Sequence, residues 1–325
     1  MFITAFIPTY RRPQDLQRCL EGLKQQTRPA DEVLVVVRDI DTETWEFFKT
    51  YDAECLPLRT ITATVPGHVP ALNIGLDEAN GDLICITDDD ACPHPDWLVR
   101  IEAHFATNLQ VAGVGGRDWV YQGMRLVEGR SEIVGKVQWF GRVIANHHLG
   151  VGKAREVDVL KGANMSYRKA AVGELQFDQR LQGQGLQVHD ELAFCLALRR
   201  AGWVLVYDPQ VAVDHYSSDR AAEADQRDQF NPAVNFSATC NETLLLLEHF
   251  PPAQQIIFLI WAVFIGTSES MGLIQWLRFL PSQGARSTQK LIACLRGRWR
   301  GLQLWQQSQL GCLPAPAVAP RIRSN

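Results

Sequence analysis

The stretch that decides the fold is residues 84–97, ICITDDDACPHPDW, in which an apolar run passes directly into three consecutive aspartates. A short apolar run of this kind is typical of a strand buried on both faces of a parallel sheet. Three adjacent carboxylates repel one another, which raises their pKa values unless a cation neutralises them. Hard oxygen ligands at a strand end suit Mg²⁺ or Mn²⁺. The alternative is a solvated acidic turn, but the position after a buried strand favours a metal site.

Strand and helix patterns alternate along the first half of the chain. The expected segments are strands at 2–7, 32–37, 58–64 and 82–87 and helices at 14–26, 42–51 and 69–79. This alternation predicts βαβ units and therefore an α/β fold with a mostly parallel sheet flanked by helices. A further helix is predicted at 188–201, and the chain becomes helical from about residue 233.

Polar segments follow three of the expected strands. They are the residues at 8–12, the pair Arg38 and Asp39, and the aspartates at 88–90. In an open α/β sheet, ligands bind beyond the carboxyl ends of the strands. The sequence therefore predicts that these three segments converge on one crevice.

Composition and charge exclude some partners. Hydrophobic residues make up 46% of the 325 residues, and the formal net charge of −4 gives no reason to expect nucleic-acid binding. The eight cysteines are scattered without a CxxC pair, which indicates reduced intracellular thiols. The N-terminus lacks the basic start and long apolar run of a signal peptide, so we expect a cytoplasmic location.

Together, five segments resemble a family 2 inverting glycosyltransferase with the GT-A fold. The matching segments, in the family's order, are FIPTYRRP (6–13), LVVVRD (34–39), VPALNIGLDEANGDLICITDDDACPHPDWL (69–98), GANMSYRK (162–169) and RRAGWVLVYDPQVAVDHY (199–216). The resemblance covers roughly residues 1–216. It implies a Rossmann-like mixed, mostly parallel sheet of the GT-A type, followed by a C-terminal helical appendage.

The resemblance also implies a domain organisation. We expect a catalytic domain over residues 1–230, with the nucleotide and donor half at 1–110 and the acceptor half at 111–230. A helical region at 231–310 and a disordered tail at 311–325 complete the chain.

The implied reaction is metal-dependent transfer of a sugar, with inversion, from a nucleotide-diphosphate-sugar to the hydroxyl of a glycan or lipid-linked acceptor. Polysaccharide or glycolipid synthesis is the expected setting. The family's pattern places the donor at Pro8, Thr9, Arg11, Asp39, His68, Asn73, Asp88 and Asp89. Leu72 stands where the family often has Arg, which leaves the choice among uridine, guanosine and thymidine open.

The metal and catalytic residues follow from the same resemblance. Asp88 and Asp90 fill the outer positions of the family's DxD element, and His215 completes the coordination of Mn²⁺ or Mg²⁺. The catalytic base is Asp190 or Glu191, although acidic residues also favour the first turn of any helix. The acceptor side is expected at Gly162, Asn164 and His189.

The region at 253–305 combines apolar and basic segments. Residues 256–265 are apolar without a break, and no Asp or Glu follows Glu269, whereas eight Lys and Arg residues do. Such a composition suits helices that lie on an anionic membrane surface, here the inner face of the plasma membrane. A helical subdomain packed on the catalytic domain, with a solvated basic face, is the alternative.

Two other functions remain open at this stage. A sugar nucleotidyltransferase also binds Mg²⁺ with aspartates, but its first loop is usually glycine-rich, and the segment PTYRRP has no glycine. A non-catalytic, membrane-attached module that binds sugar nucleotides is the other alternative, because the segment VHDEL (188–192) departs from the family's usual spelling.

Overall fold

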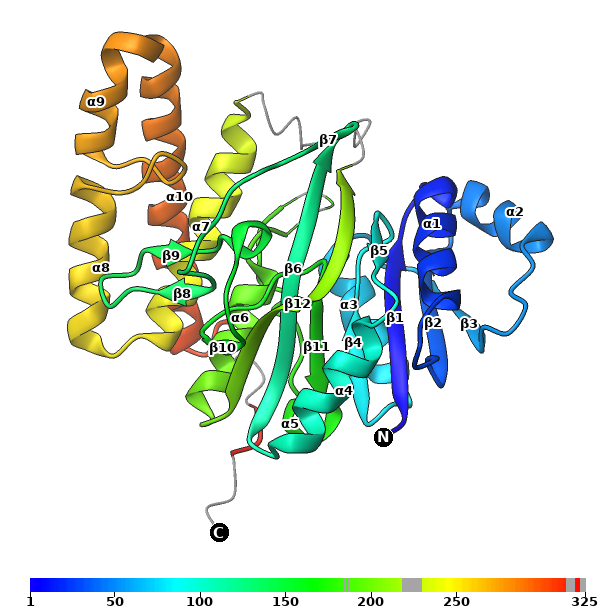
Figure 1. The fold of residues 1–325 in the computed structure, drawn as a ribbon. Coiled ribbons are helices and arrows are strands. Elements are labelled where there is room, and N and C mark those ends of the chain that lie inside the picture. Colours follow the sequence, from blue (N-terminus) through cyan, green and yellow to red (C-terminus); the bar gives the residue numbers. More distant parts are fainter. Residues whose placement is uncertain (184, 186, 218–229, 314–318, 322–325) are drawn as a thin grey trace.

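A computed structural model describes residues 1–183, 185, 187–217, 230–313 and 319–321. A single large sheet forms the centre of the fold (Figure 1). In sheet order, its main strands are β10 (Arg155–Val157), β12 (Val204–Ser217), β6 (Val111–Gln122), β11 (Met165–Arg168), β4 (Leu83–Ile86), β1 (Ile3–Thr9), β2 (Glu32–Arg38) and β3 (Leu58–Ala63). The block β4–β1–β2–β3 is parallel, and so is the pair β6 and β12, whereas β11 runs antiparallel between β4 and β6. The predicted mixed, mostly parallel sheet is confirmed.

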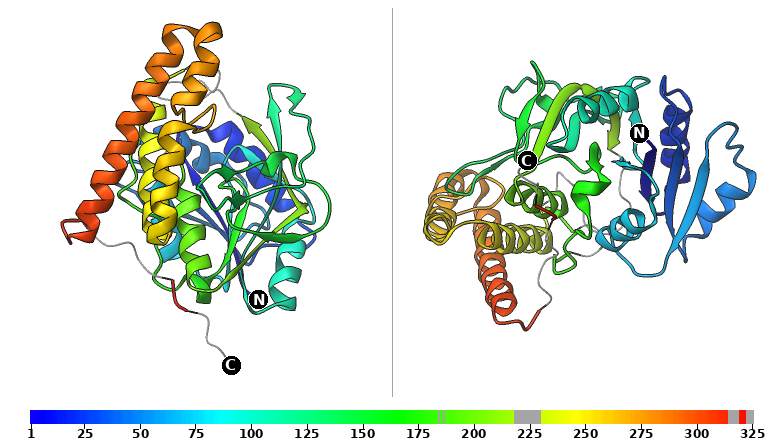
Figure 2. Two further views of the ribbon diagram at one scale, coloured as in Figure 1. Left: turned by 90° about the vertical axis from the view of Figure 1, so that its left-hand side faces the viewer. Right: turned by 90° about the horizontal axis from the view of Figure 1, so that it is seen from below.

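Helices cover both faces of this sheet (Figure 2). One face carries α1 (Pro13–Lys24), α2 (Thr42–Thr50) and α4 (Trp97–Thr107), and the other carries α3 (His68–Glu78), α5 (Lys169–Val172) and α6 (Asp190–Arg200). Successive strand residues point to opposite faces, so Ile7 packs toward α1 and α4 while Phe6 packs toward α3. Both cores are fully buried, which explains the continuous apolar runs of these strands.

The segment between β6 and β10 contains more regular structure than the long loop that the sequence suggests. It forms β7 (Arg125–Leu126), the hairpin of β8 (Lys136–Val137) and β9 (Val143–Ile144), and the short helix η1 (His147–Leu149). The β8–β9 hairpin packs on the C-terminal helices through Phe140, whose ring lies 5.1 Å from that of Trp261. The strand-like pieces near 203–207 and 211–213 are one strand, β12, interrupted by a bulge.

Within the described residues, the C-terminal appendage contains four helices. They are α7 (Pro232–His249), α8 (Pro252–Phe264), α9 (Leu273–Gln283) and α10 (Ala285–Gln309). The helices α7 and α10 approach each other closely at Gly297 and Gly301, where an added Cβ would meet the carbonyl oxygens of Phe236 and Cys240. Among the described residues, no helix combines the length and the apolar character needed to cross a membrane.

The last described residues correct one expectation. Ala319 is buried in the main core, and the indole of Trp203 donates a hydrogen bond of 2.7 Å to the carbonyl oxygen of Pro320. The prediction of a disordered tail over 311–325 is therefore wrong for 319–321, because a proline-rich segment can still dock when a side-chain donor captures its carbonyl group. Residues 314–318 and 322–325 lie outside the described residues.

The packing of α7 on α10 yields a prediction. We expect Gly301→Val to lower the free energy of unfolding by about 2 kcal/mol or more, because its side chain would force the two helix backbones apart. Chemical denaturation measures this loss. Gln306→Val is the matched control, since position 306 is exposed on the same helix. Equal stability of the two variants would show that this close approach does not hold the appendage.

Candidate functional site

Two aspartates and a histidine come together at the end of β4. Their donor atoms, one from each of Asp88, Asp90 and His215, all lie within 4.8 Å of one another. Oδ1 of Asp90 lies 3.2 Å from Nε2 of His215, and both residues are buried, whereas Asp88 is half-buried. The residues predicted as metal ligands are thus adjacent in space.

The strand register explains why His215 reaches this place. The short strand β5 (Ala91–Pro93) pairs antiparallel with β12, and this pairing sets His215 opposite Ala91. The backbone N–H of Tyr216 donates to the carbonyl oxygen of Asp90 at 2.8 Å. A residue 125 positions further along the chain is therefore fixed beside the aspartates by ordinary sheet hydrogen bonds.

Asp89 points away from this cluster and is fully buried. Its carboxylate accepts a hydrogen bond of 2.8 Å from the hydroxyl of Thr9 and pairs at 2.5 Å with Arg12. Burial raises the pKa of Asp89 to about 7, although the charge of Arg12 opposes this rise. Asp89 and Thr9 are therefore bonded to each other and buried, and their contacts with the donor stay a prediction.

Two cationic side chains balance the charge of the cluster. Arg12 donates to Asp90 at 2.8 Å as well as pairing with Asp89. His215 lies between Asp90 and Asp118, with its Nδ1 3.8 Å from the Asp118 carboxylate. Burial lowers the pKa of His215, but the two carboxylates outweigh it and raise the pKa to about 9.

The donor set fits a divalent cation. Two carboxylates and one imidazole match the preferences of Mn²⁺, and the carboxylates alone match those of Mg²⁺. Arg12 and His215 already place positive charge against Asp90, and a metal ion bound to His215 would replace its proton, because only the neutral imidazole is a ligand.

An acidic pair opens helix α6 on the other side of the crevice. The side chain of Asp190 is buried, with Oδ1 accepting the N–H of Glu191 at 2.8 Å and Oδ2 lying 3.5 Å from Nε2 of His68. Burial and the charge of Glu191 raise the pKa of Asp190 well above its usual range, and Asp88 adds to the rise. The hydrogen bond from Asp190, together with Lys161, lowers the pKa of Glu191 to about 2 despite burial. The pair therefore tends to share one proton.

The first turn of α3 contacts the loop that precedes this pair. The backbone N–H groups of His68 and Val69 donate to the side-chain oxygen of Gln187 at 3.1 and 3.2 Å. The N–H of His68 also reaches the carbonyl oxygen of Gly185 at 2.9 Å. These contacts bring His68, predicted as a donor contact, to the acidic pair.

The remaining residues that the sequence predicts to bind the sugar donor lie at the ends of β1 and β2. Pro8 is buried in β1, and Asp39 is exposed directly after β2, where its carboxylate pairs with Arg38 at 3.2 Å. Arg11 is exposed with a left-handed backbone, and its N–H donates to Asp41 at 2.6 Å. The strand ends thus present Asp39 and Arg11 to solvent near one edge of the sheet.

Two asparagines predicted as contact residues have other partners. Asn73 exchanges hydrogen bonds of 3.0 and 2.7 Å with the backbone of Phe177, and Asn164 is fully buried between Trp97 and Val211. Their polar groups tie segments of the fold together, and their contacts with donor and acceptor stay predictions.

The other predicted acceptor residues are better placed. Gly162 is half-buried and faces open space, since an added Cβ would meet no atom within 4 Å. His189 is half-buried with a left-handed backbone, φ 76°, at the start of α6. Both positions are therefore accessible beside the crevice.

Sequence reasoning missed Arg12 and Asp118. Arg12 is the second of two adjacent arginines, and only the direction of the chain entering α1 decides which of them turns toward the aspartates. Asp118 lies in β6 and His215 in β12, two residues apart in the register of the paired strands, because Asp118 pairs with Val213 and His215 with Val120. The sequence alone carries no signal that joins the two.

Comparison with solved structures shows the same fold in known glycosyltransferases. TarS of S. aureus, solved in complex with UDP-GlcNAc, matches 96% of this chain and 92% of its own at 16% identity and a TM-score of 0.56. The mannosyltransferase PcManGT of Pyrobaculum calidifontis, solved with GDP-Man and Mn²⁺, matches 94% of this chain and 88% of its own at 15% identity and a TM-score of 0.53. At these identities the likeness concerns the fold alone.

Curated relatives match part of the chain. Glycosyltransferase AglE of Haloferax volcanii is 30% identical over 124 residues, which are 37% of this chain and 40% of that protein. The amylovoran biosynthesis glycosyltransferase AmsE of Erwinia amylovora is 35% identical over 83 residues, 25% of this chain and 31% of that protein. The matches thus span less than half of either relative.

A family model covers most of the chain. The model described as "Glycosyltransferase like family 2" matches residues 2–229, which include the sheet, the aspartate cluster and the acidic pair. The chain therefore belongs to the glycosyltransferase-like family 2.

Proposed function

We propose that this chain transfers a sugar from a nucleotide-diphosphate-sugar to an acceptor hydroxyl with inversion at the anomeric carbon. The observation that carries the proposal is the cluster of Asp88, Asp90 and His215 at the end of β4, whose ligand atoms lie within 4.8 Å of one another. The cluster of Asp88, Asp90 and His215 lies close enough to the acidic pair for Asp88 to raise the pKa of Asp190. Residues 1–110 would serve the donor and 111–230 the acceptor.

The cluster is suited to a donor diphosphate. A divalent cation held by Asp88, Asp90 and His215 would supply positive charge to the leaving diphosphate. Solved neighbours with this fold bind UDP-GlcNAc, or GDP-Man together with Mn²⁺, which supports this class of donor. Asp39, exposed at the end of β2, is placed to contact the nucleoside.

The acidic pair is suited to proton removal. As the acceptor oxygen forms its bond to the anomeric carbon, the bond from that carbon to the diphosphate oxygen breaks, and the acceptor proton passes to a carboxylate. Asp190 is the proposed base when the proton that the pair shares lies on Glu191, and Glu191 is the second candidate. His68, 3.5 Å from Asp190, orients this carboxylate, and the open space at Gly162 admits the acceptor.

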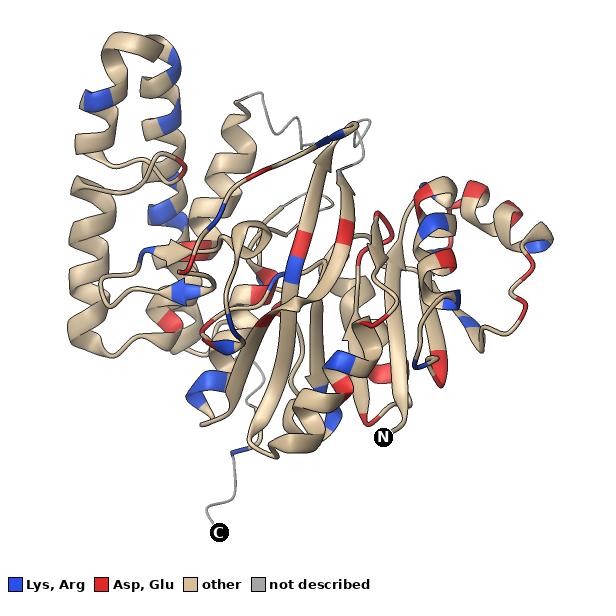
Figure 3. Ribbon diagram, in the orientation of Figure 1, with Lys and Arg blue, Asp and Glu red and all other residues tan. Residues whose placement is uncertain are grey.

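We also propose that the region at 253–305 rests on an anionic membrane surface. Helices α8 and α9 lie on the outer side of the appendage (Figure 2), and Ile256, Ile260 and Phe264 form an exposed stripe along α8. On α10, Ile292, Arg296 and Trp299 are exposed at helical spacing, and Trp299 is 63% exposed. Lys and Arg outnumber acidic residues on α9 and α10 (Figure 3), which suits anionic headgroups and a lipid-linked acceptor.

A panel of nucleotide-sugars tests the reaction. With Mn²⁺ present, we expect release of the nucleoside diphosphate from at least one donor, UDP-GlcNAc and GDP-mannose being the first to test. Asp190→Asn should lower kcat by about 100-fold or more, because it removes the proton acceptor while keeping the side-chain volume. A larger loss in Glu191→Gln would move the base to Glu191. Absence of turnover with every donor would contradict the proposal and favour a non-catalytic module.

Metal binding is tested without any donor. In protein freed of metal with a chelator and titrated with Mn²⁺, we expect Asp88→Asn to weaken binding by about 10-fold or more, because it removes one of three ligands. Paramagnetic resonance of free Mn²⁺ gives the affinity. Asp96→Asn, an acidic position six residues beyond Asp90, is the control and should bind like the unmodified protein. Equal affinity of all three proteins would show that the cluster is not the metal site.

Sedimentation with vesicles tests the membrane surface. Phosphatidylcholine vesicles that contain phosphatidylglycerol should bind the protein better than phosphatidylcholine alone. Combined reversal of Arg278, Arg286 and Arg296 to Glu should weaken that binding by about 100-fold or more, since each basic residue near an anionic surface contributes about 1 kcal/mol. Lys49→Glu with Arg125→Glu, exposed on other elements, is the control. Unchanged vesicle binding of the triple variant would contradict the proposed membrane contact and favour a helical subdomain that only packs on the catalytic domain.

A further inference from the structure

The candidate base stands at the end of a segment that the C-terminal helices hold in place. We define the base segment as residues 177–182 and 187–190, which lead from β11 and α5 into helix α6. Helix α7 packs against α6 directly, because Leu245 belongs to the same buried core as Leu192 and Leu198. The appendage therefore reaches the element that carries the acidic pair.

Asn241 makes the closest polar connection between α7 and the base segment. Its side-chain oxygen accepts the backbone N–H of Gln182 at 2.7 Å, and its amide nitrogen donates to the carbonyl oxygens of Gln182 and Val188, both at 2.9 Å. Asn241 is fully buried, and Val188 lies two residues before Asp190. One side chain thus holds the backbone of the base segment at both Gln182 and Val188.

Asn is unfavourable in the interior of a helix unless its side chain forms hydrogen bonds there. It ranks well below Ala and Leu in helix propensity, and a buried amide without partners would cost free energy. At this position both ends of the amide are matched by backbone groups of the base segment. The residue type is therefore explained by the segment that it holds.

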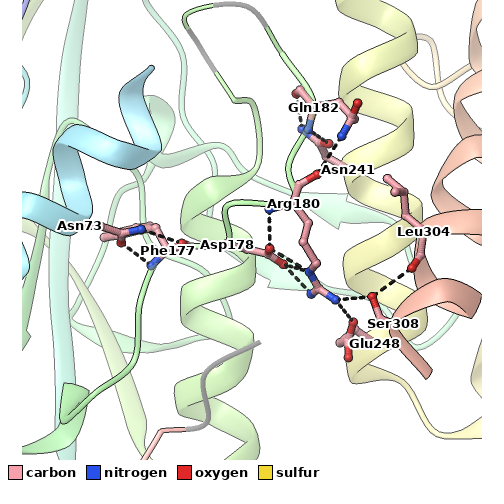
Figure 4. A network of polar contacts seen from close by, with 9 residues as sticks. All are labelled: Asn73, Phe177, Asp178, Arg180, Gln182, Asn241, Glu248, Leu304 and Ser308. Carbon is pink, nitrogen blue, oxygen red and sulfur yellow. Dashed lines mark hydrogen bonds and ion pairs between the residues drawn. The ribbon is translucent and has the colours of Figure 1, made fainter. Parts of the chain in front are cut away.

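A second contact from the appendage holds the same segment further upstream (Figure 4). Arg180 pairs with Asp178 at 2.6 Å within the segment, and it also reaches Glu248 of α7 at 3.0 Å and Ser308 of α10 at 2.7 Å. The backbone N–H of Arg180 also donates to the Asp178 carboxylate at 2.9 Å, so both the backbone and the buried side chain of Arg180 are held. Two helices of the appendage thus anchor one loop.

The other side of the segment is fixed by α3. Asn73 holds the backbone of Phe177 in both directions (Figure 4), and Gln187 accepts the N–H groups of His68 and Val69. The base segment is therefore held between helix α3 on one side and the helices of the appendage on the other.

We propose that Asn241 is a positioning residue for the catalytic base, so that helix α7 is part of the active site and not only a support for membrane binding. The inference rests on the proposed function, because it assigns to Asn241 the placement of the Asp190 and Glu191 pair. Its action is on the backbone at Val188, and through it on the first turn of α6.

The test compares Asn241→Leu, which keeps the side-chain volume and removes every polar contact, with Asn235→Leu on the same helix. The side chain of Asn235 donates to the carbonyl oxygen of Glu269 at 3.3 Å, and within the described part of the chain no hydrogen bond joins it to the base segment. Three quantities are measured: hydrogen exchange of residues 188–194, the Kd of the donor with Mn²⁺, and kcat for release of the nucleoside diphosphate. Asn241→Ser, which keeps one hydroxyl, is measured in parallel in case the leucine variant does not fold.

For Asn241→Leu we expect faster hydrogen exchange at residues 188–194, with exchange in α4 unchanged. We also expect kcat to be about 10-fold lower and the donor Kd to change by less than about twofold, because a misplaced base slows only the chemical step. Asn235→Leu should match the unmodified protein in all three. Faster exchange with an unchanged kcat would overturn the positioning role, and so would unchanged exchange. If the unmodified protein turns over no donor, the proposed function fails, while exchange at 188–194 still shows whether Asn241 holds the segment.

Discussion

Arg12 and His215 neutralise the carboxylates that follow β4, and they reach this point from distant parts of the sheet. Arg12 follows β1, the strand beside β4, whereas His215 belongs to β12 near the far edge. Removing either cation would leave buried carboxylates without compensation, which is among the most costly defects in a folded protein. The charge balance at this place therefore ties the two halves of the sheet together and fixes the crevice between them.

The same arrangement explains how the site separates its two tasks. Around the aspartate cluster, Arg12 and His215 place positive charge against Asp90. Around Asp190, burial and a neighbouring carboxylate favour the protonated form, which keeps a proton within the pair. The contrast follows from position, since one cluster lies at strand ends beside Arg12 and the other opens a helix packed against the appendage.

Much of this fold is predictable from the sequence because its strands are buried on both faces and read as continuous apolar runs. The helix at 190–200 and the strands at 83–86 and 32–38 follow from these runs with small shifts of their ends. The closeness of Asp88, Asp90 and His215 was predictable because they belong to short motifs that the family resemblance marks. Side-chain direction was not predictable: Asp89 bonds to the Thr9 hydroxyl, and Asn73 and Asn164 bond to backbone groups. The hydrogen bond from Asn241 of α7 to Val188 could not be predicted from the sequence, because the two residues are far apart in the chain and only tertiary packing brings them together.

The central claim is that Asp88, Asp90 and His215 hold a divalent cation which contacts the donor diphosphate. Electron–nuclear double resonance of Mn²⁺ bound to the protein with UDP or GDP tests this claim most directly. The account predicts a nitrogen coupling from one histidine, which disappears in His215→Gln, together with a phosphorus coupling from the diphosphate. A spectrum with phosphorus coupling alone would remove His215 from the site, and a spectrum with neither coupling would contradict the account.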